Sequence, residues 1–110
     1  MTTLTKTFSA LADETRLSIV EDLITRGELP AGALVRGSGM TAPAISRHLK
    51  VLRNAGLIEQ RVDGTRRLYS ARGDALRAIA DWTQSHRAFW EGGLDRLEVA
   101  LMLEEDEKNG

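Results

Sequence analysis

A change of hydrophobic period at Gly56 constrains the fold of this 110-residue chain more than any other feature. Before it, residues 41–54 place apolar side chains every three or four positions, which is the spacing of an amphipathic helix. After it, residues 58–71 form two short β-branched or alternating runs around Asp63-Gly64. That dipeptide is typical of a tight hairpin turn in which both residues take positive φ. The pattern predicts a helix followed directly by a two-stranded hairpin.

Four other helices are expected around this helix and hairpin, so the chain should be mainly α-helical. Asp13 and Thr41 are positioned as N-caps, Gly27 as a helix stop and Asp74 as the cap of a long last helix. Gly92-Gly93 weakens the middle of the last helix and allows a kink there. The expected ranges of these helices are 3–11, 14–26, 30–36 and from 75 onward.

Composition narrows the class of protein. The chain has no cysteine, which excludes disulfides, cysteine-bound metals and cysteine nucleophiles. No apolar run approaches the roughly 18–20 residues of a membrane span, and acidic residues interrupt the segment where a secretion signal needs an apolar core. We therefore expect a cytoplasmic protein with one domain over residues 1–103 and a frayed acidic tail over 104–110. Its small size favours oligomerisation.

The formal net charge of -1 hides a basic segment in the middle of the chain. Residues 36–72 carry eight basic and two acidic side chains, a net charge of +6, whereas the rest carries seven basic and fourteen acidic ones, a net charge of -7. A basic surface on an acidic body is typical of nucleic-acid binding. The alternative is an ordinary solvated face, so the positions of these charges decide between the two.

Many of these charges lie on the helix predicted over 41–54. Ile45, Leu49 and Leu52 form its buried stripe. Its outward face begins with small residues that let the backbone approach DNA closely, and basic side chains suited to phosphate follow. Arg47 is long and planar enough for bidentate contact with a guanine edge. The predicted DNA-binding residues of this helix are Thr41, Ala42, Pro43, Ser46, Arg47, Lys50 and Arg53.

Three arginines surround the predicted hairpin turn. A narrow basic tip of this kind suits the DNA backbone or the minor groove, whose negative potential attracts arginine. Lone surface arginines usually have no such role, but these follow directly after a helix, a short glycine turn and a second helix, which together make a helix-turn-helix. We therefore predict that Arg61, Arg66 and Arg67 contact DNA.

In these features the chain resembles the ArsR-type winged helix-turn-helix repressors, over residues 8 to about 103. Two blocks carry the resemblance: FSALADETRLSIVEDL at residues 8–23 and SRHLKVLRNAGLIEQRVDGTRRLYS at residues 46–70. The second block is the more specific one. The resemblance implies a winged helix-turn-helix fold, operator binding as a repressor, in some members autoregulation, and a dimer formed by the first and last helices.

The implied homodimer would be held together by apolar side chains of those two helices. Its two-fold symmetry predicts an inverted-repeat operator in double-stranded DNA, with half-site centres about 10 bp apart or a small multiple of that. The predicted interface residues are Leu4, Phe8, Trp82, Phe89, Trp90, Leu94, Leu97 and Leu101.

The last helix is similar to a branch of the family without metal sites. Members that sense soft metals use cysteines, which this chain lacks. Members that sense zinc or nickel use histidines and carboxylates of the last helix, but here Asp81 and His86 lie about 140° apart on a helix and make too few ligands. We predict no metal and no cofactor. His48 is expected to be half-buried at a packing seam, and His86 to be a partly exposed residue of the dimer helix.

Three alternatives compete with a metal-free repressor. A metal or small-molecule inducer could bind near the last helix, where aromatic side chains could line a pocket, although such residues are more often part of a dimer seam. A winged-helix module that binds protein would not need a net charge of +6 on its helix and wing. An enzyme is disfavoured because Ser46 and His48 diverge by about 200° on a helix, and no phosphate-binding glycine loop is present.

Overall fold

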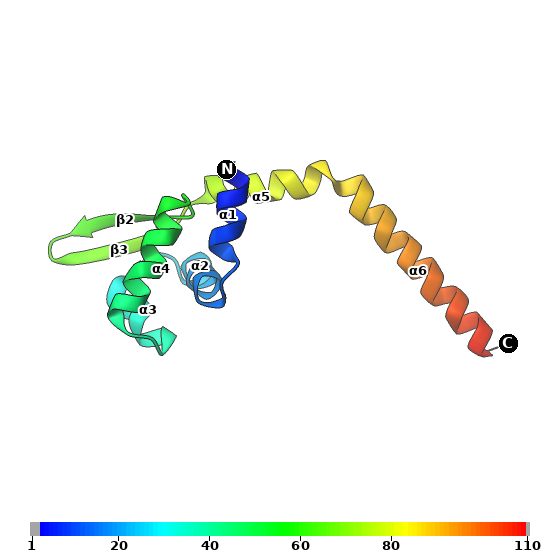
Figure 1. Ribbon diagram of the computed structural model, residues 1–110, viewed down its shortest axis with the longest axis horizontal. Coiled ribbons are helices and arrows are strands. Elements are labelled where there is room, and N and C mark those ends of the chain that lie inside the picture. Colours follow the sequence, from blue (N-terminus) through cyan, green and yellow to red (C-terminus); the bar gives the residue numbers. More distant parts are fainter. Residues whose placement is uncertain (1–2, 110) are drawn as a thin grey trace. The chain divides into compact units, whose positions relative to one another are not determined.

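The computed structural model describes residues 3–109, and the chain divides into two compact units, residues 1–78 and residues 79–110 (Figure 1). It is mainly helical with a small antiparallel sheet, as expected from the sequence. In chain order the elements are α1 (Thr3–Leu11), α2 (Glu14–Arg26), β1 (Leu29–Pro30), α3 (Ala31–Ser38), α4 (Ala42–Asn54), β2 (Ile58–Asp63), β3 (Arg66–Ala71), α5 (Gly73–Ser85) and α6 (Arg87–Asn109).

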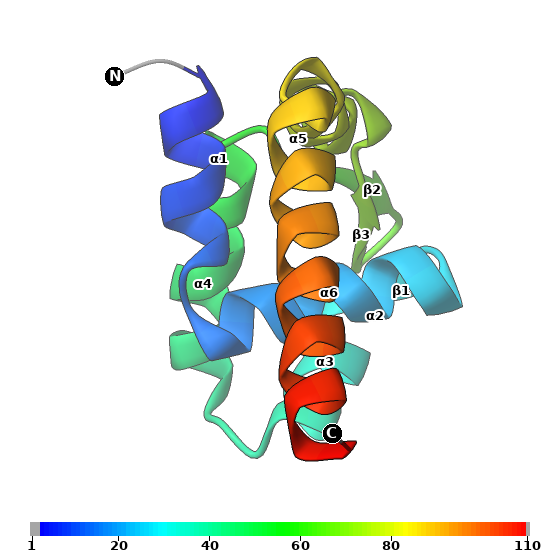
Figure 2. The same cartoon turned by 90° about the vertical axis from the view of Figure 1, so that its right-hand side faces the viewer.

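The hydrophobic core lies in the first unit, where α4 packs against α1, α2, α3 and the hairpin. The two views of the ribbon show α1 lying beside α4 (Figures 1 and 2). Ile45, Leu49 and Leu52 of α4 are buried, as the sequence predicts, and Val20 of α2 and Leu57 pack with them. Because α4 buries one continuous stripe, its opposite face is left to solvent.

Two of the predicted helix boundaries, at Asp13 and Gly27, are confirmed, whereas Asp74, expected as the cap of the last helix, lies inside the first turn of α5. The Asp13 carboxylate accepts a hydrogen bond from the Arg16 backbone N–H at 3.0 Å, and Gly27 ends α2 with φ of 81°. This N–H lowers the pKa of the Asp13 carboxyl below its usual range. α2 repeats apolar residues at Leu17, Val20, Leu23 and Ile24, and of these Leu17 and Ile24 are exposed. The apolar arc of α2 is therefore wider than the part that the core covers.

The sheet has a third strand that the sequence analysis misses. β1 pairs with β3, and β3 pairs with β2, so β3 is the central strand. Pro30, expected in the first turn of the third helix, instead pairs with Leu68 in β1 and precedes α3 as its N-cap. A two-residue strand carries no periodic signal, and it exists only because β3 supplies the partner.

The hairpin is present, but the predicted position of its turn is wrong by one residue. Asp63 pairs with Arg66 in the ladder, so the two-residue loop is Gly64-Thr65 rather than Asp63-Gly64. Only Gly64 has positive φ, at 63°, and Asp63 remains extended within β2. Glycine with positive φ at the first loop position is typical of a type II′ turn, which joins twisted strands as well as the expected type I′ turn does.

The prediction of a single long last helix is wrong, because α5 and α6 are separated at His86. At this break, side chains lie within hydrogen-bond distance of the last backbone carbonyl oxygens of α5. The His86 Nδ1 atom lies 2.8 Å from the Trp82 carbonyl oxygen, and the Trp90 indole N–H donates to the Thr83 carbonyl oxygen at 3.1 Å. Gly92-Gly93, where the sequence allows a kink, lies within α6.

The second unit ends in helix. α6 continues through the acidic residues 104–107 to Asn109, in the segment where the sequence analysis expects a frayed tail. The domain limit at residue 103 stays a prediction. Within residues 3–109, no helix is both long enough and apolar enough to cross a membrane.

Candidate nucleic-acid interface

α4 turns a basic face away from the core. Thr41 caps the helix by accepting a hydrogen bond from the Ala44 backbone N–H at 3.3 Å. Pro43 lies in the first turn, where its missing N–H leaves no intrahelical bond unmade. All seven predicted DNA-binding residues of this segment are exposed on the same helix or at its cap: Thr41, Ala42, Pro43, Ser46, Arg47, Lys50 and Arg53.

One partly buried arginine, Arg16, fixes α4 against the helices behind it. The Arg16 guanidinium donates from Nε to the Ala10 carbonyl oxygen at 2.6 Å, and its Nη1 lies 3.4 Å from Nδ1 of His48. Arginine has only donors, so the His48 ring accepts at Nδ1. This side chain therefore links the end of α1, the start of α2 and the middle of α4, and His48 has the half-buried position at a helix seam that the sequence predicts.

The two strands of the wing, β2 and β3, divide their arginines between two faces. Residues directly opposite one another in a sheet share a face, and successive residues alternate. Arg67 is opposite Val62, and Tyr69 is opposite Gln60, so these four side chains share one face. Arg61 is opposite Leu68 and Arg66 is opposite Asp63, so these two arginines belong to the other face.

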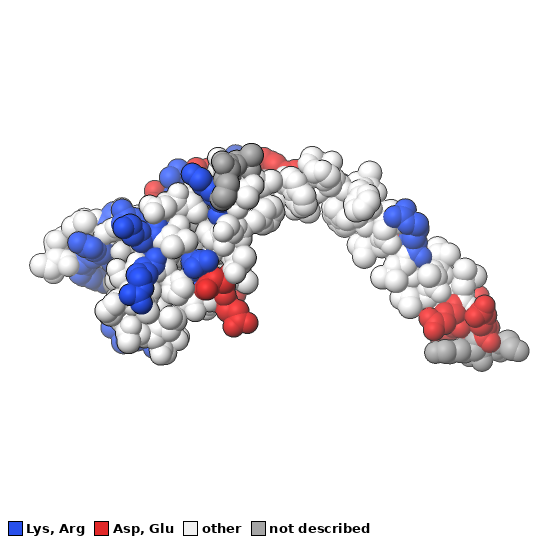
Figure 3. Space-filling model, viewed as in Figure 1, with Lys and Arg blue, Asp and Glu red and all other residues white. Residues whose placement is uncertain are grey.

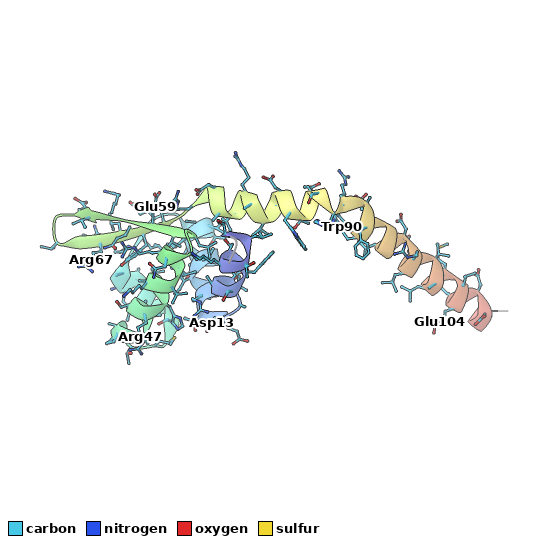
Figure 4. The ribbon with its side chains drawn as sticks, turned by 45° about the horizontal axis from the view of Figure 1, so that its top comes forward. Asp13, Arg47, Glu59, Arg67, Trp90 and Glu104 are labelled. Atoms are coloured by element: carbon cyan, nitrogen blue, oxygen red, sulfur yellow. The ribbon has the colours of Figure 1, made fainter. Side chains whose placement is uncertain are left out.

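A groove separates α4 from the face of the wing that carries Arg67. Basic side chains from both elements line it, and Figure 3 shows Lys and Arg gathered over this part of the first unit. Figure 4 shows Arg47 projecting from α4 and Arg67 from the hairpin. The groove is lined by Ser46, Arg47, Leu49, Lys50, Arg53, Asn54, Ile58, Glu59, Gln60, Arg67 and Tyr69.

Arg61 does not line this groove and is held by an acidic residue. Its Nε and Nη2 atoms donate to the two carboxylate oxygens of Glu28, each at 2.7 Å. Hydrogen bonding from Arg61 lowers the pKa of the Glu28 carboxyl, and the same contact raises the pKa of Arg61. Of the three arginines predicted to contact DNA, Arg66 and Arg67 are exposed near the turn, whereas Arg61 is paired.

Several residues of this surface are absent from the sequence prediction. Asn54, Gln60 and Tyr69 line the groove. The period-2 alternation of the hairpin places Gln60 and Tyr69 beside Arg67 once the register is known, but the register depends on the turn. Glu28 gives no local signal because its partner is 33 residues away.

The predicted interface residues are largely uncovered in the single chain. In the first unit, Leu4 is half-buried and Phe8 is 41% exposed. In the second unit, Phe89 is 77% exposed. The remaining exposed members of the predicted set are Trp82, Trp90, Leu94, Leu97 and Leu101.

The structure gives no support for a metal centre in the part of the chain that it describes. There, no three His, Cys, Asp or Glu side chains come together as ligands. His86 is exposed, and its ring lies 4.9 Å from that of Trp82 between centroids. Its Nδ1 atom faces the Trp82 carbonyl oxygen and the Ser85 hydroxyl, so this histidine takes part in the break between α5 and α6.

A helix-turn-helix whose second helix exposes basic and small residues, followed by a β-hairpin with a basic groove face, defines a winged helix-turn-helix DNA-binding domain. A family model described as a helix-turn-helix domain matches residues 11–61. The chain is 45% identical over 74 residues to the HTH-type transcriptional regulator Rv2034 of Mycobacterium tuberculosis, covering 67% of this chain and 68% of that protein. It is 47% identical over 57 residues to the arsenical resistance operon repressor of Escherichia coli, covering 52% of this chain and 49% of the repressor.

Solved structures agree with these relatives. An ArsR-like transcriptional regulator from Rhodococcus is 32% identical with a TM-score of 0.70, over 86% of this chain and 89% of that one. A homodimeric winged helix-turn-helix DNA-binding domain from Mycobacterium bovis is 29% identical with a TM-score of 0.64, over 78% of this chain and 82% of that one. The chain belongs to the ArsR family of winged helix-turn-helix transcriptional regulators. Its family and fold are those of DNA-binding regulators, which are not enzymes.

Proposed function

We propose that this chain is a homodimeric repressor that places α4 of each subunit in a major groove of its operator and the wing beside it. The observation that carries this proposal is the exposed face of α4, where basic and small residues cover one side of a helix that buries Ile45, Leu49 and Leu52 on the other. A helix packed in this way is a rigid platform, so its outward side chains keep their positions relative to DNA.

The side chains of this surface divide between base reading and phosphate binding. Arg47, near the middle of α4, makes bidentate contact with a guanine in this proposal, and Ser46 beside it donates or accepts in the same groove. Lys50 and Arg53, farther along the helix, are placed for phosphate, as are Arg66 and Arg67 on the wing. Thr41, Ala42 and Pro43 are small enough for the start of α4 to approach the backbone closely.

The dimer is proposed to form through Leu4 and Phe8 of α1 and through the exposed apolar residues of the second unit. The homodimeric state of the Mycobacterium bovis domain supports this arrangement. A two-fold dimer with one α4 per subunit requires an inverted repeat whose half-site centres are about 10 bp apart or a small multiple of that.

Two alanine variants test how the roles are divided. Arg47→Ala should cost about 1–3 kcal/mol on the operator and relax the preference for one base pair, because a bidentate contact is lost. Arg66→Ala should weaken binding to operator and random DNA alike. It should also make the negative slope of log K against log salt shallower by about 0.9, the value for one phosphate contact. Gel-shift titration on both duplexes at several salt concentrations measures both effects, and the operator is located by footprinting the upstream DNA of the protein's own gene.

Equal losses for both variants on operator and random DNA would remove Arg47 from base reading. A wild-type protein that prefers no duplex over heparin at moderate salt would contradict the proposed function as a whole and favour a protein-binding module.

A further inference from the structure

The ion pair between Glu28 and Arg61 spans the central strand of the sheet. Glu28 precedes β1, Arg61 lies in β2, and β3 runs between these two strands. Gly27 ends α2 with positive φ and directs the chain so that Glu28 reaches the wing. Both Nε and Nη2 of Arg61 are used, in the parallel two-bond geometry that is the strongest arrangement for arginine and carboxylate.

The strand alternation places this pair on the face of the wing opposite the α4 groove. Arg67 lines that groove together with Tyr69, while Arg61 shares its face with Leu68. Glu59 is opposite Ser70 on the Arg61 face, although Glu59 also lines part of the groove, and Figure 4 shows Glu59 and Arg67 on opposite sides of the hairpin. Arg61 and Arg67 therefore point to opposite faces and differ in their partners, although the sequence predicts the same role for both.

Pairing changes what Arg61 contributes to DNA binding. A cation adds to sequence-independent affinity when it neutralises a phosphate and releases a condensed counterion. An arginine already neutralised by a carboxylate releases none unless the pair is broken first. The same two hydrogen bonds hold β2 to the segment before β1, so they fix the wing to the body of the domain.

We propose that Glu28 is a specificity-determining residue: it holds Arg61 as a positioning residue of the wing and keeps the charge of Arg61 from binding phosphate. This inference rests on the proposed DNA-binding function. The affinity for random DNA is then lower than the number of wing arginines predicts, while the base-reading residues of α4 are unaffected. Glu28 thereby raises the ratio of operator binding to random-DNA binding.

The test compares four variants on a random duplex by fluorescence anisotropy at a series of salt concentrations. Glu28→Gln removes the carboxylate charge but keeps the side-chain size, so Arg61 becomes available and the salt slope should steepen by about 0.9. The double variant Glu28→Gln/Arg61→Gln should return to the wild-type slope. Arg67→Gln should make the slope shallower by about 0.9, because one phosphate contact is lost. Glu21→Gln, which removes an exposed acidic residue of α2 that does not line the groove, measures the general effect of lost negative charge.

Three results would overturn the inference. The slope of Glu28→Gln could equal that of the wild type, or be steeper by no more than the slope of Glu21→Gln is. The double variant could keep the steeper slope, which would mean that the gain does not depend on Arg61. The slope of the double variant could instead become as shallow as that of Arg67→Gln, which would mean that Arg61 binds phosphate despite Glu28. An exposed ion pair contributes little to folding, and thermal denaturation of each variant verifies that it folds.

The Arg67→Gln variant separates this inference from the proposed function. If Arg67→Gln leaves the slope unchanged, the surface formed by α4 and the wing does not bind DNA and both proposals fail. If Arg67→Gln lowers the slope and only the Glu28 variants fail to behave as expected, the proposed function stands and Glu28 has no part in it.

Discussion

Arg16 holds α4 in place against α1 and α2 through one side chain. Its side chain is 19% exposed, and its guanidinium contacts the Ala10 carbonyl oxygen at the end of α1 and the His48 ring in α4. The backbone N–H of the same residue binds Asp13 and completes the cap of α2. Three helices therefore depend on one residue, which touches none of the proposed DNA contacts.

We expect Arg16→Met to destabilise the folded chain by about 1.5–3 kcal/mol, the range for a hydrogen bond to a charged group. Methionine keeps most of the aliphatic volume, so the loss comes from the Ala10 carbonyl and His48 being left without their donor. Urea unfolding followed by circular dichroism measures this change.

Arg77→Met is the matched control for Arg16→Met, because Arg77 is exposed in α5 and its substitution should change stability by no more than about 0.5 kcal/mol. If both variants unfold at the same urea concentration as the wild type, the guanidinium contacts of Arg16 do not contribute to stability.

At the scale of elements, local patterns predict what local interactions determine. The buried stripe of α4 and the caps at Asp13 and Thr41 are visible in the sequence, because each depends on residues within one or two turns. The exposed basic and small residues of α4 follow from the same period. These features make up most of the candidate site.

The elements that the sequence analysis misses or misplaces depend on distant or side-chain contacts. β1 exists because Leu29 pairs with Tyr69, 40 positions later. The break at His86 depends on Trp90 and His86 side chains that cap α5, whereas glycine propensity indicates a different position. The pairing of Arg61 with Glu28 likewise needs the sheet to bring them together. Local patterns cannot predict these features, because the partners meet only in the folded chain.

The turn of the wing provides a prediction at this scale. Gly64 has φ of 63°, which an L side chain adopts at a cost of roughly 1–2 kcal/mol. We therefore expect Gly64→Ala to destabilise the domain by about that amount and to lower DNA affinity by disturbing the wing. Thermal denaturation and gel shift on the operator measure the two effects.

Gly37→Ala is the control with the opposite sign. Gly37 lies inside α3 without positive φ, and an added Cβ there meets no atom within 4 Å. Alanine should stabilise the domain by about 0.4–1 kcal/mol because it restricts the unfolded chain. Equal effects of the two substitutions would show that the conformation of Gly64 is not under strain when a side chain is added.

At the scale of the whole molecule, the exposed apolar side chains of α6 raise the question of which face a partner covers. Leu94, Leu97 and Val99 are 57%, 55% and 56% exposed, so exposure does not distinguish them. Position around the helix does. At about 100° per residue, Leu94 and Leu97 fall on one side with Trp90 and Leu101, and Val99 falls roughly opposite. A seam that runs along the helix covers the first set and leaves Val99 outside.

We expect Leu94→Glu combined with Leu97→Glu to dissociate the proposed dimer, and Val99→Glu to leave it intact. Each leucine contributes roughly 1.5–3 kcal/mol when buried. Counting only one of the two copies of each leucine in the dimer still gives about 3–6 kcal/mol, a rise of roughly a hundredfold to ten-thousandfold in the dimer dissociation constant. Sedimentation equilibrium measures the dimer dissociation constant. Operator affinity should fall in parallel, because a single subunit binds only one half-site. A dimer that survives the double substitution, or that Val99→Glu disrupts equally, would place the subunit contact on another face.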